Sequence, residues 1–581
     1  MFNQLLPAQP GTAPLAAAIR ACRTHLLMAL LFSALVNLLY LVPTLYMMQV
    51  YDRVVPTGGV LTLVLLTVVA VFALGTLAAL DWLRTRLLIR AGLRLDKLLA
   101  STILARIVDM QGGKPSTQAM REFDNVRAAV SGQGVLALFE APWTPLYLAC
   151  CFMLHPAIGV LTLVGGLILF ILAVLNERDS RPRLKSAIQS TNSAYAAQEG
   201  IAGQTEVVRA LGMRQASINR QIVERQAAVA QYADAQLNGG KYSGVIKFLR
   251  LAMQSLSLGL AALLAVKGQI SPGSIIAASV LLSRAVAPIE MLVGAWPNLT
   301  QARTSWKALV DLFASTAHVD KPRTALPAPA GKVQLEGVSV RLPGAEAPQL
   351  RQVTLTLSPG QTLGVIGPSG SGKTTLARVL AGALSPTTGV VRLDGAEYAA
   401  RESDELARYI GYLPQTPSLF AGSIKDNISR FSRDMALRSP AEIDALAVAA
   451  AMAAGAHEMI LRLPAAYDTV LGPFGSGVSA GQAQRIALAR ALFGAPPLLV
   501  LDEPNSNLDQ EGESALMSAI LAATARGAVV VIVAHRAGVL SRVDRLMVLR
   551  DGAVQMEGPR EEVLARMRSA AANLPAGVRP Q

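Results

Sequence analysis

Residues 367–375 read Gly367-Pro368-Ser369-Gly370-Ser371-Gly372-Lys373-Thr374-Thr375, the pattern G-x-x-x-x-G-K-[ST] of a phosphate-binding loop. An apolar run at 362–366 precedes the loop and is typical of a buried strand, and a helical pattern follows it. Strand, loop and helix in this order direct backbone N–H groups and a helix N-terminus at phosphate oxygens. We expect Lys373 to reach the β- and γ-phosphates of a nucleotide and Thr374 to bind magnesium through its hydroxyl.

Composition indicates that part of the chain lies in a membrane. The 581 residues are 52% hydrophobic and 16% charged, with a mean hydropathy of +0.41, whereas soluble proteins carry about 25% charged residues. The net charge of +14 suits nucleic acid or anionic lipid. Arg and Lys flank the apolar runs, and no basic stretch is interleaved with aromatic residues, so we expect a lipid bilayer as partner and no nucleic acid.

Apolar runs predict six membrane spans. Residues 26–50 and 54–80 each exceed the roughly 20 residues needed to cross a bilayer. The linker between them holds only Asp52 and Arg53 as charges, which predicts a tight hairpin there. Residues 141–176 are also uncharged, and His155-Pro156 near the middle predicts two spans joined by a turn. Weaker segments at 249–266 and 273–296 complete the six.

Basic residues predict which loops face the cytoplasm. Arg and Lys are concentrated after spans two and four and before span one, which places these loops and the N-terminus inside. The two loops, 81–130 and 177–250, have helix-favouring compositions and are predicted to extend the membrane helices. Each is expected to end in a short crosswise segment, near 120–125 and 205–210. Such segments are either solvated stalks or contacts that relay movement to the nucleotide domain.

Charged residues within or beside spans leave two interpretations open. Arg284 in span six either lines a polar path through the membrane or pairs with a neighbouring helix for assembly alone. Glu140 lies near the cytoplasmic interface and is predicted to be structural.

The predicted fold class is an α-helical six-span membrane domain followed by an α/β domain with a phosphate-binding loop. The predicted divisions are a short cytoplasmic N-terminal segment at 1–24, the six-span domain with cytoplasmic helical extensions at 25–313, a Pro/Ala-rich linker at 314–331, the α/β domain at 332–567 and a disordered tail at 568–581.

Polar residues follow three further strands or strand-like runs of the α/β domain. The strand at 498–501 ends in Asp502, predicted to hold magnesium, and Glu503, predicted to polarise the attacking water as general base. The strand at 529–534 delivers His535 to the same edge, where we expect a γ-phosphate contact. Gln415 is placed to bridge magnesium and the attacking water from a mobile loop.

A second anion-binding candidate is the stretch Val478-Ser-Ala-Gly-Gln482, which precedes a helix. Ser479, Gly481 and Gln482 either offer donors to a nucleotide, together with the helix N-terminus, or form an ordinary helix cap.

The order of these motifs resembles that of ABC transporter ATPases: phosphate loop, Gln415, the Ser479 signature, Asp502–Glu503, Ser506-Asn-Leu-Asp509 and His535. Six preceding spans resemble the type I ABC exporter half-transporter. The resemblance implies that ATP and Mg²⁺ are the ligands. It also implies that the signature of one subunit faces the phosphate loop of a second, so that the working unit is a homodimer with two composite sites.

A narrower resemblance is to the permease/ATPase of type I protein secretion, the PrtD-like family, and it rests on the stretches at 45–53, 138–143, 457–464 and 501–509. It implies ATP-driven export across the bacterial inner membrane of proteins with an uncleaved C-terminal signal, such as proteases, lipases or surface-layer proteins. The implied partners are a periplasmic membrane-fusion adaptor and an outer-membrane channel, with the ATPase domain in the cytoplasm. One departure is that Val478 and Ala480 replace the usual Leu and Gly of the signature. The alternative function is export of lipid or small amphiphiles by the same ATPase.

Overall fold

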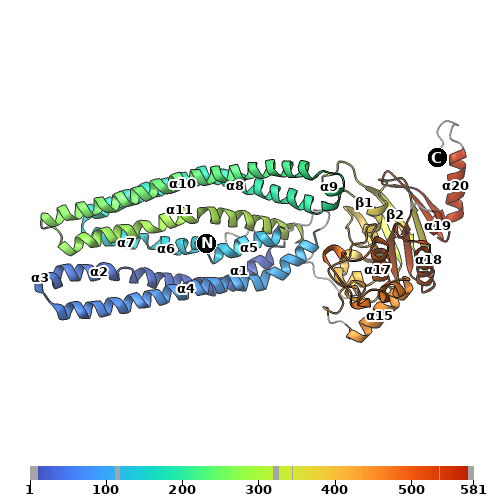
Figure 1. The fold of residues 1–581 in the computed structure, drawn as a ribbon, viewed down its shortest axis with the longest axis horizontal. Coiled ribbons are helices and arrows are strands. Elements are labelled where there is room, and N and C mark those ends of the chain that lie inside the picture. Colours follow the sequence, from blue (N-terminus) through green and yellow to red (C-terminus); the bar gives the residue numbers. More distant parts are fainter. Residues whose placement is uncertain are drawn as a thin grey trace. The chain divides into compact units, whose positions relative to one another are not determined.

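The computed structural model describes residues 11–110, 118–317, 326–342, 344–435, 438–534 and 537–572. The chain divides into two compact units, one of residues 1–110 and 115–320 and one of residues 111–114 and 321–581. The first unit is helical and the second is α/β (Figure 1).

Six helical segments of the first unit are long and apolar enough to cross a membrane, which confirms the six predicted spans (Figure 1). In chain order they are α1 (Ala13–Leu39) with α2 (Val42–Gln49), a π-helical turn (Val50–Val54) and α3 (Val55–Thr57); α4 (Val60–Val108); α5 (Ala119–Val130) with α6 (Gln133–Glu140) and α7 (Thr144–Leu154); α8 (Pro156–Ala202); α10 (Arg214–Val266); and α11 (Pro272–Ser315).

The turn between spans one and two lies later than predicted. The first span continues helically through Asp52 and Arg53, and the chain reverses at Gly58, whose φ of 63° is in the left-handed region that favours glycine. Asp52 is not a linker charge, because its carboxylate accepts hydrogen bonds from the Ser271 hydroxyl (2.6 Å) and the Gly273 backbone N–H (2.7 Å) at the start of α11. The turn at His155-Pro156 is confirmed: α7 ends at Leu154, and His155 Nδ1 accepts from a backbone N–H as the cap of α8.

The predicted helical extensions are present, because α4, α8 and α10 continue without a break well beyond the apolar runs. Their location in the cytoplasm stays a prediction. The segment at 205–210 is a separate short helix, α9 (Thr205–Ala210), between α8 and α10 (Figure 1). The other crosswise prediction, at 120–125, is wrong. Those residues belong to α5, and Phe123 is buried in a cluster with Leu99 of α4 and Leu309 of α11.

The second unit contains a six-stranded sheet in the order β12-β11-β3-β10-β9-β6 and a four-stranded antiparallel sheet in the order β2-β1-β4-β5. The strands are β1 (Val333–Val340), β2 (Leu350–Leu357), β3 (Thr362–Ile366), β4 (Thr388–Leu393), β5 (Ala396–Glu397), β6 (Ile410–Leu413), β9 (Leu498–Asp502), β10 (Val529–Val533), β11 (Arg545–Arg550) and β12 (Ala553–Pro559), with a small pair β7 (Gly422–Ser423) and β8 (Val470–Leu471). In the six-stranded sheet all neighbours are parallel except β11 and β12.

Helices cover both faces of the six-stranded sheet, and its central strands are therefore apolar throughout. Along β9, Leu498 and Val500 pack in one buried cluster with α12, whereas Leu499 and Leu501 pack in another with α17 and α18. The helices of this unit are α12 (Lys373–Leu380), α13 (Ser403–Arg408), α14 (Ile424–Ile428), α15 (Pro440–Ala453), α16 (His457–Leu461), α17 (Ala480–Leu492), α18 (Gln510–Ala525), α19 (Ala537–Leu540) and α20 (Arg560–Ala572).

Helix α20 includes residues 568–572, so the predicted disordered tail is wrong for them, and residues 573–581 lie outside the described part of the chain. The other predicted domain limits remain predictions.

Candidate nucleotide-binding site

The predicted site residues follow strands that run side by side in one direction. The order β3-β10-β9-β6 is entirely parallel. The phosphate loop follows β3, Asp502 ends β9, and Gln415 follows β6 by two residues in the chain. Because the carboxyl ends of parallel strands meet at one edge of a sheet, these segments converge there, as ligand sites of open α/β sheets do.

Two glycines of the loop lie where a side chain does not fit. A Cβ on Gly367 would lie 2.2 Å from the Leu549 carbonyl oxygen, and one on Gly372 would lie 2.6 Å from that of Gln349. Gly372 also has φ 99°, in the left-handed region. The loop therefore wraps tightly over neighbouring strands, leaving its N–H groups and the start of α12 for an anion.

Lys373 is folded back onto the loop. Its Nζ donates to the carbonyl oxygens of Gly367 and Pro368, both at 2.9 Å. Burial lowers the pKa of Lys373 from its usual value, while the carboxylates of Glu503 and Asp502 oppose that shift. A buried ammonium that donates to carbonyl oxygens of its own loop is well placed to bind the oxygens of an incoming phosphate.

Asp502 is fully buried at the end of β9. Within the described part of the chain, neither carboxylate oxygen has a hydrogen-bond partner. Burial raises the pKa of Asp502, an effect that the neighbouring Thr374 hydroxyl opposes. Buried carboxylate oxygens without a partner are costly unless a cation or water satisfies them.

One pocket of about 480 Å³ brings half of the predicted site residues together, and its volume is within the usual range of ligand sites. Glu503 and Gln415 line it with the loop. Glu503 has φ 50°, a left-handed conformation that costs energy in a residue with a Cβ and that is often found at functional sites. The predicted residues along the pocket are Ser369, Gly370, Gly372, Lys373, Thr374, Thr375, Gln415 and Glu503.

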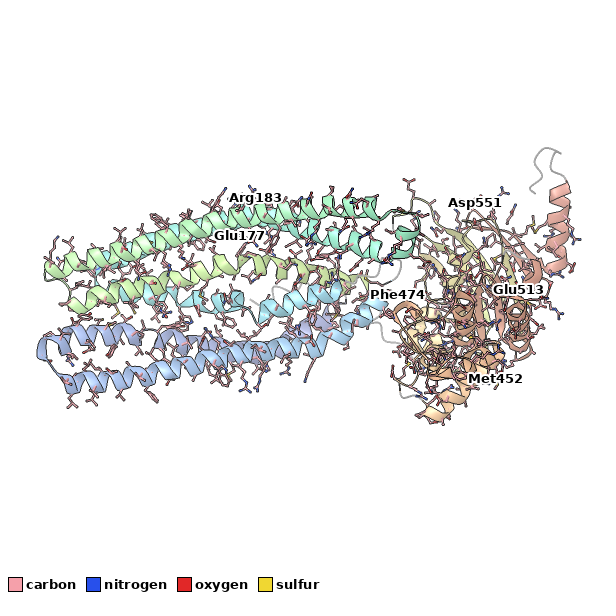
Figure 2. All side chains as sticks on the ribbon, in the orientation of Figure 1. Glu177, Arg183, Met452, Phe474, Glu513 and Asp551 are labelled. Atoms are coloured by element: carbon pink, nitrogen blue, oxygen red, sulfur yellow. The ribbon has the colours of Figure 1, made fainter. Side chains whose placement is uncertain are left out.

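The pocket has further lining residues that sequence reasoning missed. They come from the segment before β2, from the start of β2 itself and from the turn between β11 and β12: Ala347, Pro348, Gln349, Arg351, Asp551 and Gly552 (Figure 2 labels Asp551). Gln349 Oε1 accepts a hydrogen bond from the Thr375 hydroxyl at 3.1 Å. The Asp551-Gly552 dipeptide is a turn signal in the sequence, but only the β11–β3 pairing places it beside the loop.

The signature residues do not line this pocket. Ser479 is the N-cap of α17: its hydroxyl accepts from the Gln482 backbone N–H (3.3 Å), and its own N–H donates to Gln482 Oε1 (2.9 Å). Within one chain the helix-cap interpretation therefore holds. Ser479 remains exposed, and Phe474 just before it is almost fully exposed (Figure 2). His535, predicted to contact the γ-phosphate, lies outside the described residues.

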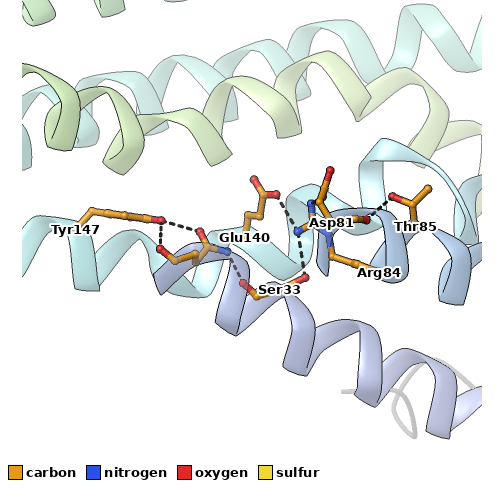
Figure 3. Close-up of polar contacts among 7 residues, drawn as sticks. Ser33, Asp81, Arg84, Thr85, Glu140 and Tyr147 are labelled. Atoms are coloured by element: carbon orange, nitrogen blue, oxygen red, sulfur yellow. Dashed lines mark hydrogen bonds and ion pairs between the residues drawn. The ribbon is translucent and has the colours of Figure 1, made fainter. Parts of the chain in front are cut away.

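A buried polar cluster ties three helices of the membrane unit together (Figure 3). Arg84 of α4, only 4% exposed, donates to Glu140 Oε1 of α6 (3.1 Å), to Ser33 Oγ of α1 (3.2 Å) and to Asp81 Oδ1 one turn earlier (2.6 Å). Glu140 thus joins α6 to α4 through its ion pair with Arg84. Arg284 lies over the Tyr40 ring, with 3.8 Å from Cζ to the ring centroid, a contact within the protein.

Known proteins resemble this chain over nearly its whole length. A family model described as ABC transporter matches residues 350–506. The chain is 41% identical to the type I secretion system ATP-binding protein PrsD of Rhizobium meliloti (strain 1021), covering 95% of this chain and 94% of that protein. It is 30% identical to the cyclolysin secretion/processing ATP-binding protein CyaB of Bordetella pertussis, covering 92% and 75%.

Among solved structures, a bacterial Atm1-family ABC exporter with ATP bound shares the fold, with a TM-score of 0.79 at 22% identity, covering 96% of this chain and 99% of that one.

Proposed function

This chain belongs to the ATP-binding proteins of type I secretion systems, within the ABC transporters, and we propose that it works as a homodimer that couples ATP hydrolysis to export of a protein substrate. It is a multi-pass membrane protein and an ATPase. The observation that carries the proposal is one pocket lined by Lys373, Gln415 and Glu503 in a chain that also has six membrane-spanning helices.

The predicted catalytic and phosphate-binding residues have proposed roles in hydrolysis. Lys373 would leave the carbonyl oxygens of its loop to bind the β- and γ-phosphates, and the N–H groups of residues 367–375 would bind the remaining phosphate oxygens. Glu503 acts as general base for the attacking water, and Gln415 orients that water from the loop after β6. His535 is proposed to contact the γ-phosphate.

Magnesium fits the residues beside the loop. The buried, unpartnered carboxylate of Asp502 and the adjacent Thr374 hydroxyl would hold it, with Gln415 at the edge of the site. No group of three or more His, Cys, Asp or Glu side chains able to hold a metal occurs among the described residues. Mg²⁺ is commonly bound by one or two carboxylates together with substrate phosphates, and Asp502 with Thr374 fits that pattern. The ion would neutralise charge on the transferred phosphoryl group.

The signature supports a dimer. Ser479, Gly481 and Gln482 are at the N-terminus of a 13-residue helix but do not line the pocket of their own chain. We propose that they bind the nucleotide held by the phosphate loop of a second copy, so that two ATP molecules lie between two ATPase domains. Closure of the dimer on ATP and its release after hydrolysis would shift the membrane helices between two states.

We further propose that the chain lies in the bacterial inner membrane, with the domain at 332–567 in the cytoplasm and the six-span domain at 25–313. A periplasmic membrane-fusion adaptor and an outer-membrane channel would complete the export route. The proposed cargo is a protein with a C-terminal signal. The support is the 41% identity to a type I secretion protein along 94% of that relative's length.

The test is the ATPase rate of the full-length protein in lipid nanodiscs, with and without the C-terminal segment of a secreted protein encoded beside it. Lys373→Ala is the control that removes hydrolysis. We expect the segment to change the rate specifically, while panels of lipids and small amphiphiles leave it unchanged. Stimulation by lipids with every such segment silent would refute protein export and favour export of amphiphiles.

A further inference from the structure

Helix α17, whose first turn carries the signature, also bonds to the segment that follows Glu503. The Gln484 side chain is fully buried, and its Nε2 donates to the Pro504 carbonyl oxygen at 2.9 Å. One residue later, Arg485 donates to Asp509 Oδ1 at 2.6 Å. Consecutive side chains of one helix thus hold both ends of residues 504–509.

The same segment touches α17 at a third point. A Cβ on Gly481 would lie 3.0 Å from the Asn507 carbonyl oxygen, so the glycine permits close approach of the two backbones. At its far end, Asp509 Oδ1 also accepts from the Gly512 backbone N–H at 2.9 Å and thereby caps α18. Residues 504–509 are therefore fixed between two helices rather than left as a free loop.

The near end of the segment is Glu503 itself. Its backbone N–H donates to the Val533 carbonyl oxygen of β10, and its own carbonyl accepts from the Ser506 N–H. Glu503 holds a left-handed conformation, which persists only where the surroundings impose it. The hydrogen bond from Gln484 Nε2 to the Pro504 carbonyl oxygen lies at the next residue in the chain.

We propose that Gln484 and Arg485 are positioning residues for ATP hydrolysis, which fix the general base Glu503 to the helix that carries the signature of the same chain. The proposal rests on the function proposed above. Since that signature would bind the nucleotide of the partner subunit, α17 links one nucleotide site to the base of the other. The Arg485–Asp509 pair is open to solvent on the Asp509 side, and such pairs contribute little to folding stability. The role that we assign to this pair is therefore to position residues 504–509 and not to stabilise the fold.

Arg485→Ala tests the proposal, with Arg485→Lys as conservative rescue and Arg392→Ala as matched control. Arg392 also pairs with carboxylates in this domain, those of Glu336 and Glu397 in the four-stranded sheet, and neither partner lines the pocket. All variants are full-length proteins in nanodiscs. Three quantities are measured: kcat, the Kd of a fluorescent ATP analogue, and hydrogen–deuterium exchange of residues 504–509.

For Arg485→Ala we expect kcat to fall by about tenfold or more, since small misplacements of catalytic groups have effects of this size. The Kd should stay within about twofold of wild type, because the phosphate loop is untouched. Exchange in residues 504–509 should accelerate. Arg485→Lys should recover most of kcat and of the protection, and Arg392→Ala should match wild type in all three quantities.

Wild-type kcat and exchange in Arg485→Ala would overturn the proposal, as would equal losses in Arg392→Ala. Failure of the proposed function is a separate outcome. In that case wild type itself would lack ATPase activity, or Lys373→Ala would retain it, and exchange in residues 504–509 would still report whether Arg485 holds the segment.

Discussion

Removing Arg84 should destabilise the membrane unit more than removing either of its carboxylate partners. Arg84 bonds to three groups on α1, α4 and α6 (Figure 3), and its own side chain is almost completely buried. Its partners differ in exposure: the Glu140 side chain is 12% exposed and the Asp81 side chain 46%. We therefore expect the loss of unfolding free energy to be largest for Arg84→Ala, smaller for Glu140→Ala and smallest for Asp81→Ala.

The magnitudes follow from what each variant leaves behind. Arg84→Ala strands the buried Glu140 carboxylate, and breaking a buried pair in this way costs about 3–5 kcal/mol. In Glu140→Ala, Arg84 keeps Asp81 and Ser33, so the loss is that of one charge-assisted hydrogen bond, about 1.5–3 kcal/mol. Asp81→Ala removes a half-exposed partner and should cost below about 1 kcal/mol. The double variant of Arg84 and Glu140 should lose less than the sum of the single losses.

The assay is reversible unfolding of full-length protein in mixed micelles titrated with SDS, followed by tryptophan fluorescence. The free energy of unfolding is compared for wild type, the three single variants and the double variant. Additive losses of Arg84 and Glu140 would refute a direct pair. A loss in Asp81→Ala as large as that in Arg84→Ala would refute the assignment of the energy to burial.

Three further changes test the nucleotide site and the contact between Asp52 and the start of α11. Glu503→Gln should retain binding of a fluorescent ATP analogue, trap a closed dimer visible by cross-linking and abolish turnover; wild-type turnover would remove Glu503 from its role. Gly372→Ala forces a Cβ into a left-handed conformation and against the Gln349 carbonyl oxygen, so ATP-analogue affinity should fall by about tenfold or more, one factor of ten per 1.4 kcal/mol. Asp52→Ala removes the acceptor of the Gly273 N–H at the start of α11 and should cost about 1–2 kcal/mol in the SDS titration. Asp52→Asn should lose less, and equal losses would exclude the capping role.

The phosphate loop could be predicted because its constraint is local. Glycines that must avoid neighbouring backbone, followed at once by Lys373, leave a contiguous signature in the sequence. The strand ends carrying Asp502 and Glu503 were predictable for a similar reason, since a continuous apolar run stops at two carboxylates. Gln349 and Gly552 gave no comparable signal, because only the pairing of distant strands brings them to the pocket.

The errors in the membrane unit have the same origin. The sequence places Asp52 in a linker because it interrupts two uncharged runs, whereas its partners at Ser271 and Gly273 lie more than 200 residues away in the chain. The stretch at 120–125 has a helix-favouring composition, and nothing local distinguishes a crosswise segment from the first turns of α5. Burial of Phe123 between α4 and α11 shows that the stretch is part of α5 and not a crosswise segment.

The most direct test is export itself. Cells that produce this chain with an adaptor and an outer-membrane channel, together with a protein bearing a C-terminal signal, are assayed for that protein in the medium. Wild type is compared with Glu503→Gln at equal membrane abundance. We predict export by wild type and none by Glu503→Gln, with removal of the C-terminal signal also abolishing it. Equal export by both forms of the transporter, or export that does not require the signal, would contradict ATP-driven secretion of a signal-bearing protein.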